Sequence, residues 1–493
     1  MIGALKNINK LRVLIIPGLI VLGVCAIFFA QFSTPTLYDA DGYLHIRMAE
    51  FLRDLGPRYN FHWARFSTFN GNFSDKDFLY HAILIPFTFF KDIFFGVKVA
   101  AFIFAVILFL GFYLLLKKYV DKKIVWFFLS CFFLSGNFLE TISSPRPLTL
   151  VILINLLAIY FIIRRKYLCL LITGILYSLI HVTSPLVICY ALIVETVRYF
   201  DKKEFYLKAV IFSFLGILAG FLVHPNFPNN FLVFYLNSIL VPIYTMKTGV
   251  LELGAEFFPF NTREYFLQYP LVIIGLISTV YIAVLKMPKP RFETKVFMAL
   301  GLVFFALSFT CKRYLSHGYL IMLMAFACYV SDFAGAKKSF NKPGLAAILL
   351  LMILLGVNSF NDMRYNALVA RVVNGHYEAV GRFMEKNIPE GELIFHANWS
   401  DSQYFIGLNP KNDYFVTLDP VYMYNKNPEL YKIYRDVSFG KTIDPYAVLK
   451  DTFKVKYGYA GKNYFNSLVE QIRKDTRFTI LAEDQFGVIF KLI

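Results

Sequence analysis

A run of twenty residues without a charged side chain, residues 13–32 (VLIIPGLIVLGVCAIFFAQF), constrains this chain most. At about 1.5 Å of rise per residue, such a helix is about 30 Å long, the thickness of a bilayer's hydrocarbon core. We interpret the run as a membrane anchor, because it continues into Gln31–Ser33 without the small-residue cleavage site of a signal peptide. Hydrophobic residues make up 57% of the chain, more than one globular core requires. The sequence therefore predicts a membrane protein.

Further apolar stretches follow the first, and together they predict a polytopic α-helical membrane protein with about eleven transmembrane helices. The later stretches lie at about 93–116, 124–138, 147–163, 167–182, 183–197, 209–223, 265–285, 296–311, 314–331 and 344–360. Several of them are short enough to require tilt or burial against neighbouring helices.

Alternate connections between these stretches are strongly basic, which predicts the orientation of the chain. The basic clusters are Lys6/Lys10/Arg12, Lys117/Lys118/Lys122/Lys123, Arg164/Arg165/Lys166, Arg198/Lys202/Lys203/Lys208, Lys286/Lys289/Arg291/Lys295 and Lys337/Lys338/Lys342. Basic loops face the cytoplasm, so we expect a multi-pass protein of the inner cell membrane with a cytoplasmic N-terminus. Residues 1–360 would form the transmembrane domain with outer loops 33–92 and 224–264, and residues 361–493 an extracytoplasmic domain.

The formal net charge of +17 does not indicate a nucleic-acid partner. Residues 361–493 hold 17 of the 50 basic and 16 of the 33 acidic residues, so the excess lies in the membrane part and is explained by topology. No compact basic face with interleaved aromatic residues remains. The six cysteines all fall in predicted spans, which gives no indication of a disulfide framework or a cysteine-based zinc site.

The first outer loop contains a helical pattern directly after the motif YDADGYLH (38–45). Leu44, Met48, Phe51/Leu52 and Leu55 are apolar at helical spacing, which predicts an amphipathic helix along the membrane surface. Asp41 lies at the start of this helix, where a carboxylate can cap backbone amides. A cap is therefore one interpretation of Asp41, and a catalytic carboxylate is the other.

Ionisable residues recur wherever the chain returns to the predicted outer side, and membrane-edge charges suggest function. They are Asp75, Asp77, His81, Glu140, Arg146, His181, His224, Glu252, Glu256, Lys312, Arg313 and His317. Each has a structural alternative: Asp75 and Asp77 suit a solvated turn, His181 and His224 precede prolines, and Lys312 and Arg313 can snorkel. Glu252 and Glu256 fit either a gating loop or a solvated face.

The stretch DADGYLHIRMAEFL, after an N-terminal span, resembles the first acidic motif of the GT-C superfamily of membrane glycosyltransferases, in particular of bacterial oligosaccharyltransferase catalytic subunits. The resemblance implies an enzyme that takes a sugar from a polyprenyl-phosphate or diphosphate carrier and inverts the anomeric centre. It implies that Asp41 is the catalytic aspartate, with Asp39 completing a D-x-D form. Arg313 resembles the arginine that contacts the donor phosphate, and Arg146 lies where those enzymes place a basic residue near the outer end of a span.

Two departures from that family narrow the expected reaction. Where oligosaccharyltransferases carry a second acidic motif, this chain has ETISSPRP with only Glu140, so a divalent metal (Mg or Mn) is a possibility and its ligands stay unknown. Where they read the asparagine sequon with W-W-D-Y-G, this chain has NWSDSQYF (398–405). We therefore expect a transferase that uses a polyprenyl-phosphate monosaccharide rather than a protein oligosaccharyltransferase.

Asp41 would accept the proton of the acceptor hydroxyl, and Arg313 and Arg146 would bind the phosphate as its negative charge develops. The other candidate substrate-binding residues are Asp75, Asp77, His81, Glu140, Lys312 and His317. The expected partners are the donor lipid, membrane lipid and an acceptor that the sequence does not identify. A lipid-linked sugar transporter is the alternative from another class, although we find no internal repeats typical of one. A non-catalytic scaffold is a further one.

The terminal segment alternates helix and strand signals, which predicts an α/β sandwich. We expect helices near 376–387, 428–437, 443–453 and 463–475, strands near 392–397 and 413–418, and a closing pair near 478–492. No G-x-G-x-x-G or P-loop pattern occurs, so a nucleotide site is not expected there. Segment 416–431 is rich in Tyr, Asp and Asn, and suits either a saccharide acceptor or a packed strand end.

Overall fold

The computed structural model describes residues 2–246, 250–284, 289–336 and 342–493. Lys286, Lys337 and Lys338 of the predicted cytoplasmic loops lie outside these residues. The chain divides into two compact units. Unit 1 comprises residues 1–35, 98–221 and 254–368, and unit 2 comprises residues 36–97, 222–253 and 369–493. In unit 2, the first outer loop and most of the second are grouped with the terminal segment.

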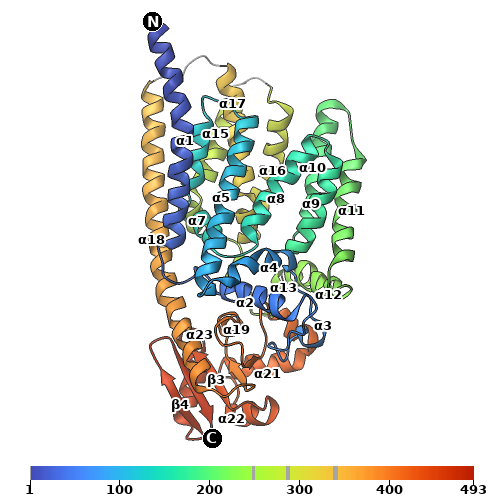
Figure 1. Ribbon diagram of the computed structural model, residues 1–493, viewed down its shortest axis with the longest axis vertical. Coiled ribbons are helices and arrows are strands. Elements are labelled where there is room, and N and C mark those ends of the chain that lie inside the picture. The colour runs from blue at the N-terminus through green and yellow to red at the C-terminus, as the bar shows by residue number, and fades with distance from the viewer. Residues whose placement is uncertain (1, 247–249, 285–288, 337–341) are drawn as a thin grey trace. The chain divides into compact units, whose positions relative to one another are not determined.

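Unit 1 is built from helices, most of which run alongside one another in Figure 1. They are α1 (Ile2–Phe32), α5 (Ile93–Tyr119), α6 (Val125–Ser130), α7 (Gly136–Ser143), α8 (Leu148–Ile163), α9 (Tyr167–Ile180), α10 (Leu186–Lys202), α11 (Leu207–Val223), α14 (Thr262–Gln268), α15 (Pro270–Val284), α16 (Phe292–Ser308), α17 (Lys312–Ala336) and the first part of α18 (Lys342–Asn387). The 3-10 turn η4 (Ala255–Phe257) precedes α14.

Among the described residues, three helices are long and apolar enough to cross a membrane: Ile93–Tyr119, Lys312–Phe333 and Ala347–Asn387. The pair Val125–Phe133 and Gly136–Ser143, bent by 73°, adds a fourth if it is one span. Shorter apolar helices are Ile16–Phe32, Phe78–Phe89, Leu148–Ile163, Tyr167–Ile180, Leu207–Val223 and Pro270–Val280. These helices make the chain a membrane protein, while the predicted number of eleven spans stays a prediction.

The stretch predicted as one span at 124–138 is broken, and local chemistry explains the break. The short 3-10 helix η2 (Cys131–Phe133) follows α6, and the Ser135 hydroxyl then accepts a hydrogen bond from the amide of Phe138, which caps α7. Gly136 lies against α18, because an added Cβ would come within 2.4 Å of the Asp362 side chain. The stretch predicted as a span at 124–138 is therefore bent between α6 and α7.

Unit 2 begins with the helix predicted after the acidic motif, α2 (Ala40–Leu55), which confirms that helix. Its apolar residues Leu44, Met48, Phe51 and Leu52 are buried, and α2 packs against α19, α4 and η1. Protein rather than a membrane surface therefore covers most of the predicted apolar stripe.

Other helical elements of unit 2 are α3 (Phe69–Asn72), α4 (Phe78–Leu84), η1 (Ile85–Phe89), α12 (Asn229–Tyr235), η3 (Leu236–Leu240), α13 (Val241–Met246), α19 (Asp401–Leu408), α20 (Val421–Lys426), α21 (Pro428–Ser438), α22 (Pro445–Ala447), η5 (Val448–Thr452) and α23 (Lys462–Lys474).

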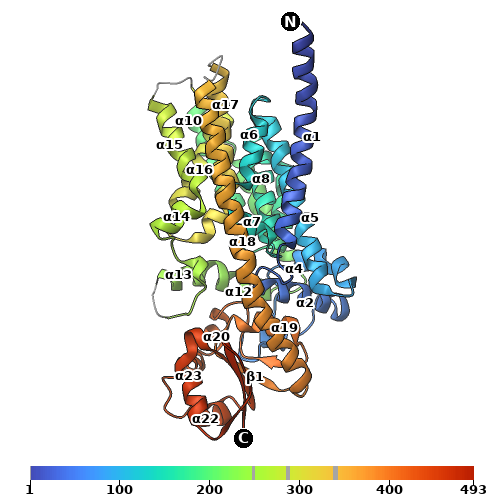
Figure 2. The same cartoon turned by 90° about the vertical axis from the view of Figure 1, so that its left-hand side faces the viewer.

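The terminal segment forms a five-stranded sheet in the order β2-β1-β3-β5-β4, which confirms the predicted α/β sandwich. The strands are β1 (Leu393–His396), β2 (Asp413–Tyr414), β3 (Tyr457–Gly461), β4 (Phe478–Glu483) and β5 (Gly487–Leu492). β1 runs parallel to β2 and β3, whereas β5 runs antiparallel to β3 and β4. The end of α18 and α19 pack on one face, and α21 and α23 on the other (Figure 2).

The first outer loop is tied to this sheet by backbone hydrogen bonds. The amide of Tyr414 in β2 donates to the carbonyl of Trp63 at 2.7 Å, and the amide of Arg65 donates to the carbonyl of Tyr414 at 2.7 Å. The Trp63 ring in turn stacks on Phe51 of α2 with ring centroids 3.9 Å apart. The loop that carries the acidic motif is therefore folded as part of unit 2.

Candidate active site

The two aspartates of the DADG motif have different surroundings at the start of α2. Asp39 is the N-cap, and its Oδ1 accepts a hydrogen bond from the amide of Asp41 at 2.7 Å. The interpretation of Asp41 as the capping residue is therefore wrong, because Asp39 performs that task. Asp41 lies in the first helical turn and is only partly buried. Its carboxylate meets the positive end of the helix dipole.

The residues after Asp41 fix α2 against the rest of unit 2. Tyr43 is fully buried, and its hydroxyl donates to Oε1 of Glu378 at 2.6 Å. Gly407 of α19 lies so close that an added Cβ would meet the Tyr43 backbone carbonyl oxygen at 2.7 Å. Arg47 donates from Nε to the carbonyl of Gly407 at 2.9 Å. The orientation of Asp41 is therefore set by a rigid helix rather than by a free loop.

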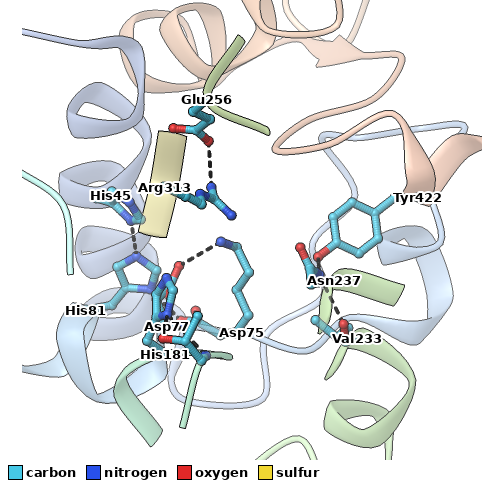
Figure 3. A network of polar contacts seen from close by, with 12 residues as sticks. His45, Asp75, Asp77, His81, His181, Val233, Asn237, Glu256, Arg313 and Tyr422 are labelled. Carbon is cyan, nitrogen blue, oxygen red and sulfur yellow. Dashed lines mark hydrogen bonds and ion pairs between the residues drawn. The ribbon is translucent and has the colours of Figure 1, made fainter. Parts of the chain in front are cut away.

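A chain of three buried side chains links α2 to the loop before α4 (Figure 3). Nδ1 of His81 lies 2.6 Å from Oδ2 of Asp75, and Nε2 of His81 lies 2.7 Å from Nδ1 of His45. A carboxylate only accepts hydrogen bonds, so His81 donates to it from Nδ1, and in its neutral form it accepts from His45 at Nε2. His45 lies four residues after Asp41, on the same face of α2.

Asp75 and Asp77 are 3% and 1% exposed, so the alternative of a solvated turn is wrong. Oδ1 of Asp75 accepts from the amide of Asp77 at 3.1 Å, and Nε2 of His224 donates to the Asp75 carbonyl at 3.0 Å. Nζ of Lys76 lies 3.3 Å from Oδ2 of Asp77. Burial nevertheless raises the pKa of Asp77, with Lys76 and His81 opposing it. Together these groups form a polar cluster inside unit 2.

In unit 1, one carboxylate holds two arginines (Figure 3 shows Arg313 with Glu256). Oε1 of Glu256 accepts from Nη2 of Arg313 at 2.6 Å, and Oε2 lies 3.3 Å from Nη1 of Arg146. Partial burial raises the pKa of Glu256, but the charges and hydrogen bonds of Arg313 and Arg146 outweigh it and lower that pKa to about 2. Glu256, whose side chain is 37% exposed, thus pairs with both arginines, and the structure brings Arg146 and Arg313 together.

Lys312 lies next to Arg313 in sequence but has a different partner. Its Nζ lies 2.8 Å from Oε2 of Glu264 and 5.1 Å from the ring centroid of Phe260. The two neighbouring cations at the start of α17 are therefore divided between two glutamates. Arg313, rather than Lys312, shares the Glu256 carboxylate with Arg146.

Three other predicted residues of unit 1 are Glu140, His317 and His181. Glu140 of α7 accepts at Oε2 from Nδ2 of Asn366 at 2.6 Å. His317 is buried one turn after Arg313, and its Nδ1 has no hydrogen-bond partner in the described part of the chain. The His181 ring lies 6.4 Å from that of His317, and its Nδ1 lies 2.8 Å from the hydroxyl of Thr183.

An apolar cavity of about 240 Å³ lies between α15, α16 and α17. α17 packs against both other helices. The lining includes Leu276, Leu302, Phe305, Tyr319, Met322 and Phe326. Tyr319 is six residues after Arg313 on α17, which is about 9 Å along the helix. This cavity, which we call the apolar groove, thus begins about two turns from Arg313 along α17.

The described residues do not fit the divalent metal that the family resemblance left open. No group of three or more His, Cys, Asp or Glu side chains among them is arranged to hold a metal ion. Asp39 caps a helix, and Asp75 accepts hydrogen bonds from His81 and Asp77.

Sequence reasoning assigned no role to His45, Lys76 or Glu378, and it predicted no partner for Glu256. His45 follows Asp41 by four residues, and this helical spacing was the available signal. The pairing of Glu256 with Arg146 joins residues 110 positions apart, for which one sequence carries no signal.

The fold is similar to that of solved oligosaccharyltransferases and of ArnT, which agrees with the resemblance of DADGYLHIRMAEFL to GT-C enzymes. The oligosaccharyltransferase of Archaeoglobus fulgidus, tethered with an acceptor peptide containing the NVT sequon, superimposes with a TM-score of 0.63 at 12% identity over 96% of this chain and 73% of that chain. The same organism's AglB, in complex with an inhibitory peptide and a dolichol-phosphate, gives a TM-score of 0.55 at 12% identity over 96% and 74%.

ArnT from Cupriavidus metallidurans, bound to undecaprenyl phosphate, gives a TM-score of 0.59 at 12% identity over 96% of this chain and 98% of that chain. No protein-family profile matches the chain. A search of curated proteins found no match either. At these identities the likeness establishes the fold alone.

Proposed function

We propose that the chain is an inverting glycosyltransferase that moves a sugar from a polyprenyl-phosphate donor to a lipid, glycan or protein acceptor at the outer face of the inner membrane. The observation that carries this proposal is the arginine pair of unit 1 with the apolar groove starting about two helical turns from Arg313. Such a combination suits a ligand with an anionic head and a long apolar tail.

Arg313 and Arg146 bind the donor phosphate, and the prenyl chain lies along α15, α16 and α17. Guanidinium groups bind phosphate oxygens through paired hydrogen bonds. The cavity has a volume of about 240 Å³, which is smaller than the roughly 300–1,000 Å³ of a typical small-molecule site. A cavity of this volume suits one part of the long prenyl chain. That ArnT from Cupriavidus metallidurans binds undecaprenyl phosphate and AglB a dolichol-phosphate supports this class of ligand.

Asp41 accepts the proton of the acceptor hydroxyl. The acceptor oxygen then bonds to the anomeric carbon while the bond from that carbon to the phosphate oxygen breaks. The electron pair of this bond stays on the phosphate, and the arginines stabilise the charge that develops there. The partial burial of Asp41, and the assignment of the cap to Asp39, support this role.

A protein oligosaccharyltransferase with a diphosphate-linked donor is the second candidate, favoured by the fold of the Archaeoglobus fulgidus enzyme. The segment NWSDSQYF does not fit recognition of an asparagine sequon, because Asp401 is 1% exposed and every residue of α19 is buried. An acidic residue enclosed in this way is not available to an acceptor peptide in solution. The monophosphate donor therefore stays our first choice.

The test is binding of a polyprenyl phosphate to the purified full chain. Arg313→Ala should weaken the affinity by about tenfold or more, whereas Lys312→Ala should change it by less than about threefold, because Lys312 is paired with Glu264. Arg313→Lys keeps the charge but not the paired donors, so an intermediate affinity is expected. Equal affinity of Arg313→Ala and the parent protein would remove the phosphate role.

A further inference from the structure

The carboxylate of Glu256 occupies the place between two guanidinium groups that an anionic ligand would take. Each oxygen has its own arginine, Arg313 at 2.6 Å and Arg146 at 3.3 Å. The three residues come from η4, from the start of α17 and from the connection between α7 and α8. Their side chains are 30–38% exposed, so a ligand can reach them.

The turn that carries Glu256 is fastened to the start of α17. The amide of Lys312 donates to the carbonyl of Phe258 at 3.0 Å, and the thiol of Cys311 lies 3.2 Å from the carbonyl oxygen of Glu256. The Phe257 ring lies 4.3 Å from the guanidinium carbon of Arg313. The backbone of the turn is therefore held without the Glu256 side chain, which is free to exchange its partners.

Charge makes Glu256 a competitor for phosphate. Its pKa of about 2 keeps it ionised at any physiological pH, so the two arginines and Glu256 together carry one net positive charge. A donor phosphodiester carries one negative charge and matches that value. The phosphate monoester released after transfer approaches two negative charges above pH 6, because its second pKa is about 6. Two arginines without Glu256 would hold this product strongly.

We propose that Glu256 is a built-in counter-anion of the donor site, displaced when phosphate binds and returning to the arginines when the product leaves. This inference rests on the proposed function. It assigns Glu256 a role in specificity and in product release. The two arginines that Glu256 has released face the additional negative charge as it develops on the leaving phosphate, and stabilisation of charge that develops in the transition state accelerates the reaction.

The experiment compares Glu256→Gln with the parent full chain in polyprenyl phosphate binding, with inorganic phosphate as a second probe. Glutamine keeps the length of the side chain and removes its charge, so the affinity for polyprenyl phosphate should rise by about tenfold. Transfer should show stronger inhibition by added polyprenyl phosphate. Glu252→Gln is the matched control, because Glu252 lies in the same loop and pairs with Arg435 at 2.9 Å, and its affinity should stay within about twofold.

Glu256→Asp keeps the charge but shortens the reach, so it should give an affinity between those of Glu256→Gln and the parent. This variant also tests the proposal if Glu256→Gln does not fold. The counter-anion role would be overturned if Glu256→Gln or Glu256→Asp bound phosphate no more tightly than the parent. The donor site would remain supported in that case if Arg313→Ala still bound polyprenyl phosphate more weakly than the parent. If Arg313→Ala also binds like the parent, the donor assignment itself fails.

Discussion

At the scale of single residues, the motif DADG divides its work between two carboxylates. Asp39 is the N-cap of α2 and accepts the hydrogen bond from the amide of Asp41, which lies in the first helical turn. A substitution can therefore remove the proposed base without removing the cap. The sequence placed both residues at the start of a helix but assigned the cap to the wrong one, because a shift of two residues changes which side chain faces the free amides.

We predict that Asp41→Asn lowers turnover by roughly 10²–10⁴, the usual contribution of a general base, with little change in melting temperature. Asp39→Ala should show the opposite pattern: a loss of about 1 kcal/mol of stability, as for other N-caps, and a smaller loss of activity. Sugar transfer and thermal unfolding of both variants measure this. An Asp41→Asn protein that transfers sugar at the parental rate would make the motif structural.

Asp401 in α19 gives a prediction about pH. Burial raises the pKa of Asp401 from 3.8 to about 7, and the hydrogen bond from the Tyr377 hydroxyl offsets this only in part. Between about pH 4 and 7 the folded state thus binds more protons than the unfolded state, and stability falls as pH rises. Asp401→Asn should remove this fall, worth about 4 kcal/mol at most at pH 8. The measurement is the melting temperature of the parent and of Asp401→Asn at pH 5 and pH 8. An equal change in melting temperature between the two pH values in both proteins would contradict the raised pKa of Asp401.

At the scale of secondary-structure elements, α2 and α4 are joined by the chain Asp75–His81–His45. All three side chains are buried, with contacts of 2.6 and 2.7 Å. Buried polar groups are costly when a partner is missing. This chain therefore fixes α2, and with it Asp41, relative to the loop before α4.

We predict that His81→Ala destabilises unit 2 by roughly 3 kcal/mol, because it leaves the Asp75 carboxylate buried without its imidazole partner. Adding Asp75→Asn to His81→Ala should recover part of the loss, since the buried charge is then gone. Limited proteolysis and thermal unfolding report the effect. Wild-type stability in His81→Ala would show that the chain does not hold α2.

Local pattern predicted α2 and the helices and strands of the terminal domain well, because each has its own apolar period. It failed for β3, which contains glycines at 458 and 461 that are unusual in strands. Gly458 is required by packing, since an added Cβ would come within 2.3 Å of the Phe490 ring. It failed again at α7, where a serine cap and a close contact with α18 interrupt an otherwise apolar run. Long-range packing, which a single sequence does not display, explains both failures.

At the scale of the whole molecule, the proposed orientation rests on the basic loops rather than on the fold. We predict that a cysteine at position 450 is labelled by an impermeant thiol reagent in intact cells, whereas a cysteine at 118 is labelled only after permeabilisation. Both positions are exposed lysines. The reverse labelling pattern would show that the predicted membrane orientation is wrong and that the proposed chemistry takes place on the cytoplasmic side.

If the arginine pair holds a polyprenyl phosphate, an experimental structure of the full chain with this lipid will show the phosphate there. We predict phosphate oxygens within about 3.2 Å of the guanidinium nitrogens of Arg313 and Arg146, the normal range of such hydrogen bonds. Glu256 should have left both arginines, and the isoprenoid tail should follow the groove of α15, α16 and α17. A bound lipid elsewhere, with Glu256 still between the arginines, would contradict this role of the arginine pair.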